Sequence, residues 1–282
     1  MKIKFFAPRW GFEKIEWESF LRTVKDAGYS GIEWFPFGEE STPEDHTRVI
    51  ALLDKYELDF TIVMAVLKHY PDVNDYLAEL RQQLNYFCGL RSGTKKPLFI
   101  SAQTGREFFS QAEIDATISC CNEISAQTGM PIYQETHRNK WSFAAHAVRP
   151  VLDRRDDFQL TFDISHWFCV SESYLQDQQE TVEKAVSRAS HIHARVGHTE
   201  GPQVYDPSLP EYKEALDEHL RVWDKYIAQR RKSGAEFCTI TPEFGPPPYM
   251  VFTNKSGAPH EEQWRINLWI KDLLEQRYSA TL

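Results

Sequence analysis

Short apolar runs alternate with longer amphipathic stretches along the whole chain. The short runs are rich in β-branched and aromatic residues and predict eight strands, at residues 3–7, 31–34, 59–64, 97–101, 131–135, 159–163, 190–195 and 237–243. The longer stretches have helical spacing and predict helices at residues 16–27, 43–56, 73–90, 111–128, 143–153, 173–188, 210–233 and 261–278. The alternation predicts repeated strand-helix units.

Turn and cap residues separate these units. Helix start signals occur at Ser41-Thr42-Pro43-Glu44 and around Pro210, and Gly28, Gly129 and Gly234 follow predicted helices. These signals support the boundaries of the predicted helices.

Eight strand-helix units most simply close into a (β/α)8 TIM barrel, an α/β fold that residues 1–282 would form as a single domain. A doubly wound open sheet is the alternative, but such a sheet usually has a glycine-rich phosphate-binding turn after an early strand. The sequence contains neither GxGxxG nor GxxxxGK followed by Ser or Thr. Two connections rich in Pro and Gly, 197–210 and 245–259, are predicted to cover the mouth of the barrel.

Composition and charge narrow the partners. The formal net charge of -9 argues against nucleic acid as the main partner, because that binding relies on clustered Lys and Arg. The N-terminal segment has no long apolar run or cleavage site, and no stretch of about 18 apolar residues could span a bilayer. We therefore expect a cytoplasmic protein with no membrane partner. Its 5 cysteines lack CxxC spacing, which favours reduced thiols.

Acidic or imidazole side chains stand at the ends of the last four predicted strands: Glu135, Asp163, His193 and Glu243. A buried carboxylate is costly unless it is paired, so each of these groups needs a partner. Structural alternatives exist: a salt bridge for either glutamate, for example between Glu135 and Arg138, and a helix N-cap for Asp163.

The seventh strand carries the strongest pattern. Alternation places His191, His193 and Arg195 on one face of a strand predicted to be buried, where a metal or an anionic substrate would supply their partners. His193 lies nearer the end of the strand and is the better ligand, whereas we expect His191 to support it. His166 follows Asp163 by three residues and is either a site residue or a core histidine.

Adjacent barrel strands lie about 4.8 Å apart, so inward-pointing groups at the ends of consecutive strands can converge on one ion. Carboxylates and imidazole suit one divalent metal ion, which would be Mn, Mg, Co or Zn. We expect the metal ligands to be Glu135, Asp163, His193 and Glu243. The sequence therefore predicts a metal-dependent enzyme.

The sequence resembles the sugar phosphate isomerase/epimerase family of the xylose isomerase-like TIM barrel superfamily, which is related to endonuclease IV. The resemblance runs from Gly28-Tyr29-Ser30-Gly31-Ile32-Glu33 to Pro242-Glu243-Phe244-Gly245. Its most specific motif is Asp163-x-x-His166, followed by His191-x-His193. In that family a Glu, Asp, His, Glu quartet binds a divalent metal, and these positions match the four ligands named above.

The resemblance implies a sugar isomerase or epimerase that acts through an enediolate on a ketose or related sugar. Glu135 and Glu243 would be the catalytic pair that removes and returns the α proton. We expect a small-molecule sugar substrate to be bound by His166, Arg195, His137, Trp10 and Trp34. Arg9 and Trp167 are further candidates, although tryptophans near a barrel mouth also simply close the core.

Other functions stay open at this point. A metal-dependent lyase or hydrolase of oxidised (keto) sugars or glycosides would use the same enolisation to expel a group β to the carbonyl. Phosphodiester hydrolysis on DNA would need more metal ligands and a basic face, and a non-enzymatic protein would bind sugar or metal without turnover. Tryptophans on the outer helices indicate either a homo-oligomer interface or packing against the barrel: Trp17, Trp223, Trp264 and Trp269.

Overall fold

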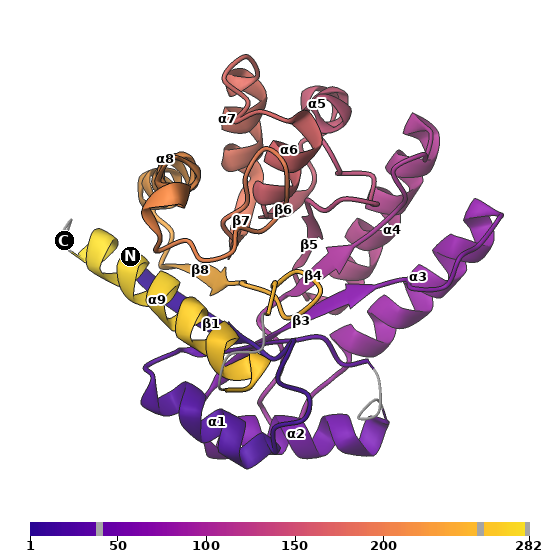
Figure 1. The fold of residues 1–282 in the computed structure, drawn as a ribbon. Coiled ribbons are helices and arrows are strands. Elements are labelled where there is room, and N and C mark those ends of the chain that lie inside the picture. Colours follow the sequence, from indigo (N-terminus) through magenta and orange to yellow (C-terminus); the bar gives the residue numbers. More distant parts are fainter. Residues whose placement is uncertain (38–41, 253–256, 280–282) are drawn as a thin grey trace.

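The computed structural model describes residues 1–37, 42–252 and 257–279. Its centre is a closed barrel of parallel strands, each followed in the chain by helix on the outside (Figure 1). Each strand pairs with the next one in sequence, and the last closes on the first, where Phe5 lies opposite Ile240. The predicted (β/α)8 TIM barrel is therefore confirmed.

The strands lie close to their predicted positions. Their bounds are β1 Lys2–Pro8, β2 Gly31–Trp34, β3 Asp59–Ala65, β4 Ile100–Gln103, β5 Ile132–Glu135, β6 Gln159–Phe162, β7 Ala189–Ala194 and β8 Phe237–Pro242. The fourth strand begins later than predicted and continues to Gln103, although the preceding segment already bonds to β3 through Leu98 N and Phe60 O, 2.9 Å apart.

The helices surround the barrel as an outer ring (Figure 1). They are α1 Trp17–Asp26, α2 Pro43–Lys55, α3 Val73–Cys88, α4 Gln111–Thr128, α5 Ala145–Arg154, α6 Ser165–Ser171, α7 Gln179–Arg188, α8 Lys213–Lys232 and α9 Pro259–Ser279, with a 3-10 turn at Pro210–Tyr212. Helix α4 has the bounds that the sequence predicts. Ser110 and Glu113 form a capping box at its start, and Gly129 ends it at φ 66°.

The predicted helix at 173–188 is wrong in its first part. A short helix, α6, follows β6 directly, and α7 begins only at Gln179. Between them the chain turns through Glu172 and Leu175, which have φ values of 47° and 59°. Residues other than glycine rarely adopt this left-handed backbone conformation, so the local sequence does not indicate a break in the helix.

Alternation along the strands separates an apolar outer layer from a polar barrel interior. Ile32, Ile62 and Ile240 belong to the hydrophobic core, whereas the neighbouring positions Glu33 and Thr241 are buried polar residues. A polar interior that opens at the carboxyl ends of the strands is where a barrel enzyme keeps its site.

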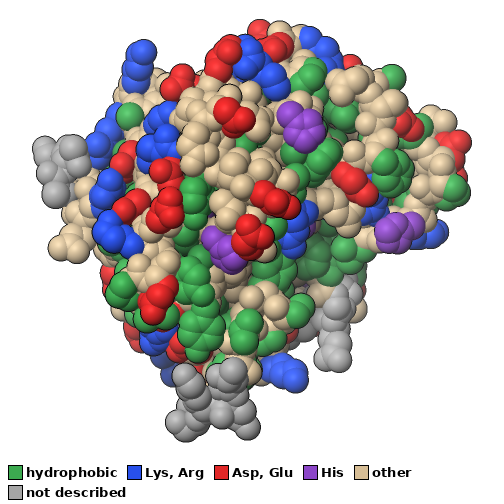
Figure 2. Space-filling model, turned by 45° about the horizontal axis from the view of Figure 1, so that its top comes forward, with side chains coloured by type: hydrophobic (Ala, Val, Ile, Leu, Met, Phe, Trp, Pro, Cys, Tyr) green, Lys and Arg blue, Asp and Glu red, His purple; other side chains and the backbone are tan. Residues whose placement is uncertain are grey.

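The surface mixes charges of both signs. Figure 2 shows acidic and basic side chains interspersed over the visible face, so the net charge of -9 does not gather there into one acidic patch. Trp17 and Trp223 are buried, at 2% and 1% exposure, and pack against the barrel instead of forming an exposed interface. Within the described ranges, the helices are all too short or too polar to cross a membrane.

Candidate active site

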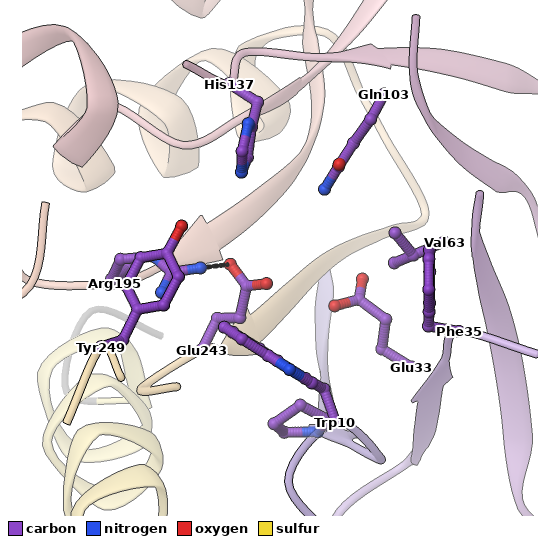
Figure 3. Close-up of a pocket in the computed structure, with 10 residues that line it drawn as sticks. Trp10, Glu33, Phe35, Val63, Gln103, His137, Arg195, Glu243 and Tyr249 are labelled. Atoms are coloured by element: carbon purple, nitrogen blue, oxygen red, sulfur yellow. Dashed lines mark ion pairs between the residues drawn. The ribbon is translucent and has the colours of Figure 1, made fainter. Parts of the chain in front are cut away.

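A cavity of about 210 Å³ opens at the carboxyl ends of the strands (Figure 3). Its walls come from β1, β2, β3 and β4 and from the segments that follow β1, β2, β5, β7 and β8. The lining residues are Pro8, Trp10, Glu33, Phe35, Val63, Gln103, His137, Arg195, Glu243 and Tyr249.

His193 lies beneath this cavity and contacts three carboxylates. Its Nε2 atom lies 2.9 Å from Glu33 Oε2, and its Nδ1 atom lies 3.0 Å from Glu243 Oε2 and 3.6 Å from Glu135 Oε1. Burial alone lowers the pKa of His193, but the charges of Glu243, Glu33 and Glu135 outweigh burial and raise the pKa well above its ordinary value. Three carboxylates therefore converge on one imidazole.

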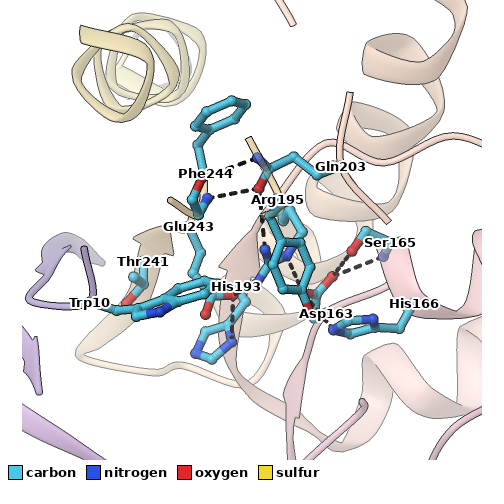
Figure 4. Close-up of polar contacts among 12 residues, drawn as sticks. Trp10, Asp163, Ser165, His166, His193, Arg195, Gln203, Thr241, Glu243 and Phe244 are labelled. Carbon is cyan, nitrogen blue, oxygen red and sulfur yellow. Dashed lines mark hydrogen bonds and ion pairs between the residues drawn. The ribbon is translucent and has the colours of Figure 1, made fainter. Parts of the chain in front are cut away.

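Arg195 bridges the carboxylates of Asp163 and Glu243 (Figure 4). Its Nε atom donates to Asp163 Oδ2 at 3.1 Å, and its Nη2 atom lies 2.8 Å from Glu243 Oε2. The guanidinium group also stacks over the rings of Tyr249 and Trp10, at 4.7 and 5.6 Å from their centroids. Burial raises the pKa of the Glu243 carboxyl, but Arg195 and His193 outweigh it, and the pKa is lowered.

The two carboxylate oxygens of Asp163 contact different groups, Ser165 and Arg195. Its Oδ1 atom accepts hydrogen bonds from the backbone N–H and the hydroxyl of Ser165, the first residue of α6, at 2.9 and 2.6 Å, whereas the N-cap position of this helix is Ile164. Its Oδ2 atom faces Arg195 and the interior. Burial raises the pKa of Asp163 to about 6, although the Arg195 charge acts in the opposite sense. One oxygen of Asp163 thus bonds to the first turn of α6, while the other faces the groups of the candidate site.

Glu135 is held by neutral donors from β4. Ser101 Oγ donates to its Oε2 at 3.3 Å, and Gln103 Nε2 donates to its Oε1 at 3.0 Å. The alternative salt bridge to Arg138 is not formed, because the Arg138 guanidinium turns to His166 and Tyr249.

These groups fit a divalent cation. Oxygens of Asp163 and Glu243 and a nitrogen of His193 all lie within 4.8 Å of one another, and Glu135 adds an oxygen beside the same imidazole nitrogen. His193 Nδ1 and Glu243 Oε2 are buried at ion-pair distances from their neighbours, yet neither makes a hydrogen bond within the described part of the chain. Carboxylate oxygens and an imidazole nitrogen that are held by charge but form no hydrogen bond match what such a cation needs.

A second group of potential ligands, Glu33, His191 and His193, lies deeper in the barrel. Here hydrogen bonds already join the members, since Glu33 Oε2 lies 3.2 Å from His191 Nε2 and 2.9 Å from His193 Nε2. His191 also contacts Thr239 Oγ1 at 2.8 Å. Glu33 therefore bonds to both histidines of β7 and orients the His193 ring.

Sequence reasoning missed Glu33 as a site residue. Burial raises the pKa of its carboxyl, but the two histidines outweigh burial and the pKa falls well below its ordinary range. The signal was available, because Glu33 sits within the apolar strand Gly31–Trp34 much as Glu135 ends its own strand. Gln103 and Tyr249 were also missed, and no local pattern points to them.

Three of the five expected substrate-binding residues line the cavity: Trp10, His137 and Arg195. A Cβ atom at Gly245 would lie 2.5 Å from the Trp10 ring, so this glycine permits the observed position of the tryptophan. His166 is buried beside the cavity, with its ring centroid 4.1 Å from that of His137. Burial lowers the pKa of both imidazoles.

Trp34 was expected to bind substrate, but it does not line the cavity. Because Glu33 points into the barrel, alternation turns Trp34 outward, where it packs on Trp17 and His46 with centroids 5.5 and 5.2 Å away. Arg9 likewise turns away from the cavity and stacks on Trp17, at 4.1 Å from the ring centroid.

Trp167 packs in the core as well. It packs edge-to-face against Phe162 and donates its indole N–H to Ser142 O at 2.9 Å.

The two long connections meet above Arg195. Gln203 Oε1 accepts the Gly245 N–H at 2.7 Å and an Arg195 N–H at 3.3 Å, and Gln203 Nε2 donates to Gly245 O. Both connections therefore contribute to the mouth of the barrel, as predicted, although residues 253–256 of the second lie outside the described part.

No protein-family model matches the chain, and no curated protein matches it in sequence. Solved structures do match. A probable 3-DHS dehydratase involved in petrobactin synthesis, from Bacillus anthracis, has 17% identity and a TM-score of 0.61 over 97% of this chain and 99% of that one. The 3-keto-D-glucoside 4-epimerase of E. coli has 12% identity and a TM-score of 0.59 over 96% and 100%.

A xylose isomerase-like TIM barrel protein from Mycobacterium smegmatis, solved in complex with magnesium, has 13% identity and a TM-score of 0.53 over 95% of this chain and 96% of that one. Near-complete coverage in both directions means that no large part of either fold is missing. The expected resemblance holds at the level of structure: this chain has the fold of the xylose isomerase-like TIM barrel proteins.

Proposed function

We propose that this chain is a divalent-metal-dependent sugar isomerase or epimerase that acts through an enediolate on a ketose or related sugar. The observation that carries the proposal is the convergence of Glu135 and Glu243 on His193 Nδ1, with an Asp163 oxygen within 4.8 Å of ligand atoms of His193 and Glu243, under a cavity at the carboxyl end of the barrel. This donor set is larger than a structural salt bridge needs.

Glu135, Asp163, His193 and Glu243 would hold the cation, which is Mn, Mg, Co or Zn. When bound, it would polarise the substrate carbonyl and so ease removal of the neighbouring proton. A magnesium complex of a protein with this fold supports such a site.

Glu135 and Glu243 are the proposed acid–base pair. They come from β5 and the end of β8, so they approach the cavity from different sides of the barrel. One carboxylate removes the α proton and the other returns a proton, either to the same face or to the opposite one. Arg195 pairs with Glu243 at 2.8 Å, whereas the neutral donors Ser101 and Gln103 bond to Glu135, so the two carboxylates have different partners.

The cavity wall suits a sugar. Trp10, Phe35 and Val63 supply apolar surface, and Gln103 and His137 supply polar groups (Figure 3). A sugar presents weakly polar C–H faces and hydroxyl edges, so such a divided wall can bind it.

The proposal is tested in two steps on purified protein. The first measures metal content by elemental mass spectrometry after loading with Mn and removing free ion, for wild type, Asp163→Asn and the surface control Asp156→Asn. We expect about one metal per chain in wild type and control, and strong loss in Asp163→Asn. No bound metal in wild type would overturn the proposal.

The second step incubates the loaded protein with ketoses and 3-keto glycosides in D2O and follows the products by NMR. Metal-dependent exchange of carbon-bound hydrogen, together with a new epimer or isomer, is the expected result, and both should be lost in Glu135→Gln and Glu243→Gln. A probable dehydratase shares this fold, so loss of water or of an alcohol from the substrate would replace isomerisation by elimination as the reaction.

A further inference from the structure

Two imidazoles stand side by side at the edge of the cavity. The ring centroids of His137 and His166 are 4.1 Å apart, and the rings are inclined by 56°. His137 lines the cavity and its ring points into it (Figure 3). His166 is fully buried, and Figure 4 shows its ring directed at Asp163.

Arg138 touches both rings through different atoms. Its guanidinium Nη1 atom lies 3.1 Å from His166 Nδ1, and its Nη2 atom donates to the Tyr249 hydroxyl at 3.1 Å, which fixes the group from a second side. A guanidinium group has donors only. His166 Nδ1 must therefore accept, and the ring proton of a neutral His166 resides on Nε2.

In the contact between Arg138 and His137, Arg138 accepts the hydrogen bond instead of donating it. His137 Nδ1 lies 2.5 Å from the backbone carbonyl oxygen of Arg138. A carbonyl only accepts, so Nδ1 carries the proton and Nε2 of a neutral His137 keeps a lone pair.

We propose that Arg138 is a positioning residue that holds the two imidazoles in opposite tautomers, so that His166 Nε2–H donates to the ligand and His137 Nε2 accepts from it. His166 Nε2 is buried and makes no hydrogen bond to any described residue; Asp163 Oδ2, 3.6 Å away, is beyond good hydrogen-bonding distance. A buried donor left without a partner is costly, and a ligand oxygen would remove that cost.

This inference rests on the proposed function and narrows it. An N–H donor beside a lone-pair acceptor recognises a carbonyl or enolate oxygen next to a hydroxyl, which is the α-hydroxy carbonyl group of a ketose. A proton on Nε2 also keeps His166 from coordinating the cation through that atom, so His166 would bind substrate while His193 serves as the imidazole ligand.

The test is side-chain ¹⁵N NMR on the full chain labelled at histidine. Spectra are recorded at pH 8, with diamagnetic Mg²⁺ and without added metal, and His137→Gln and His166→Gln assign the two rings. We expect a protonated Nε2 with an unprotonated Nδ1 for His166, and the reverse for His137. The same tautomer in both rings, or an imidazolium signal from His166, would overturn the proposal.

Substitutions at Arg138 separate the two contacts. Arg138→Met removes the guanidinium donor but keeps the backbone carbonyl, so His166 should lose its single tautomer while His137 keeps its own. Arg138→Lys retains a donor and should restore the His166 signal, and the surface variant Arg91→Met should change neither. An unchanged His166 signal in Arg138→Met would show that Arg138 does not hold the ring.

The spectra need neither a known substrate nor turnover. A failed metal or substrate screen would therefore leave the tautomer result standing, and a wrong tautomer would leave the proposed metal chemistry standing. If Arg138→Met does not fold, the wild-type and Arg138→Lys spectra still decide the outcome.

Discussion

Glu33 Oε2 lies 2.9 Å from His193 Nε2, so a carboxylate of the second strand orients an imidazole of the seventh across the barrel. In the neutral ring, the form that a metal ligand requires, this hydrogen bond places the proton on Nε2 and leaves the lone pair of Nδ1 facing Glu135 and Glu243. In metal sites, such carboxylate–histidine pairs fix ring orientation and make the ligand nitrogen more basic. Glu33 is thus a supporting residue for the proposed cation site.

We expect Glu33→Gln to weaken metal binding by about 10–100-fold while one site per chain remains. The amide keeps the size of the side chain but loses the charge that holds the His193 proton on Nε2. Competition with a fluorescent chelator measures the affinity, and Glu211→Gln, an exposed position, is the control. Unchanged affinity in Glu33→Gln would mean that Glu33 only fills the barrel interior.

Arg195 should contribute to the stability of the metal-free protein, because it neutralises Asp163 and Glu243 when no cation is present. Arg195→Met leaves two buried carboxylates close together, and loss of one partner of a buried ion pair typically costs about 3–5 kcal/mol. We expect a clear fall in the free energy of unfolding of metal-free protein, measured by urea titration. The exposed pair Arg81–Glu123 is the control, where Arg81→Met should cost less than about 1 kcal/mol.

A cation should then stabilise Arg195→Met more than wild type, since it supplies the positive charge that the variant lacks. The increase in Tm on adding Mg²⁺ measures this difference. An equal increase in both proteins would place the cation away from Asp163 and Glu243.

Much of this architecture could be predicted because apolar runs and helical periodicity are local. Most strands of the barrel are buried on both faces near their ends, so a charged residue there is conspicuous in the sequence, as Glu135 and Asp163 are. The same rule applies to Glu33, which lies next to Trp34 in β2. Alternation decides between them: within Gly31–Trp34 only one of two adjacent side chains can face the interior.

The remaining site residues depend on tertiary structure. Tyr249 reaches Arg138 and Arg195 from the connection after β8, and nothing in its neighbourhood marks it as a site residue. The split between α6 and α7 depends on Glu172 and Leu175 with positive φ, a conformation that their residue types do not favour.

Trp10 and Trp34 should respond differently to truncation. Trp34 is 2% exposed in the outer core, so Trp34→Ala should cost about 3–5 kcal/mol of unfolding free energy and leave KM of the remaining folded protein nearly unchanged. Trp10 lines the cavity, and Trp10→Ala should raise KM for a ketose substrate at least about tenfold at a smaller stability cost. Urea titration and steady-state kinetics measure the two effects, and the reverse pattern would exclude Trp10 from substrate binding.

His219 links α8 to the segment after β7, outside the proposed cation site. Its Nδ1–H donates to Ala215 O at 2.7 Å, and its Nε2 accepts the Gly197 N–H at 3.2 Å. The ring is fully buried, and burial lowers its pKa to about 4. A second ring proton would also point at the Gly197 N–H, so the imidazolium form has no partner there.

The lowered pKa predicts a pH-dependent stability. The unfolded chain binds a proton at His219 near pH 6.5, whereas the folded chain binds it only near pH 4, so this stabilisation is complete above pH 6.5 and is lost as the pH falls toward 4. Between pH 7 and 5 the loss amounts to about 2 kcal/mol. Urea unfolding at both pH values should show that difference between wild type and His219→Gln, and the exposed variant His69→Gln should behave as wild type does. If His219→Gln keeps the full wild-type pH dependence, the acid sensitivity arises elsewhere, because glutamine has no group that titrates in this range.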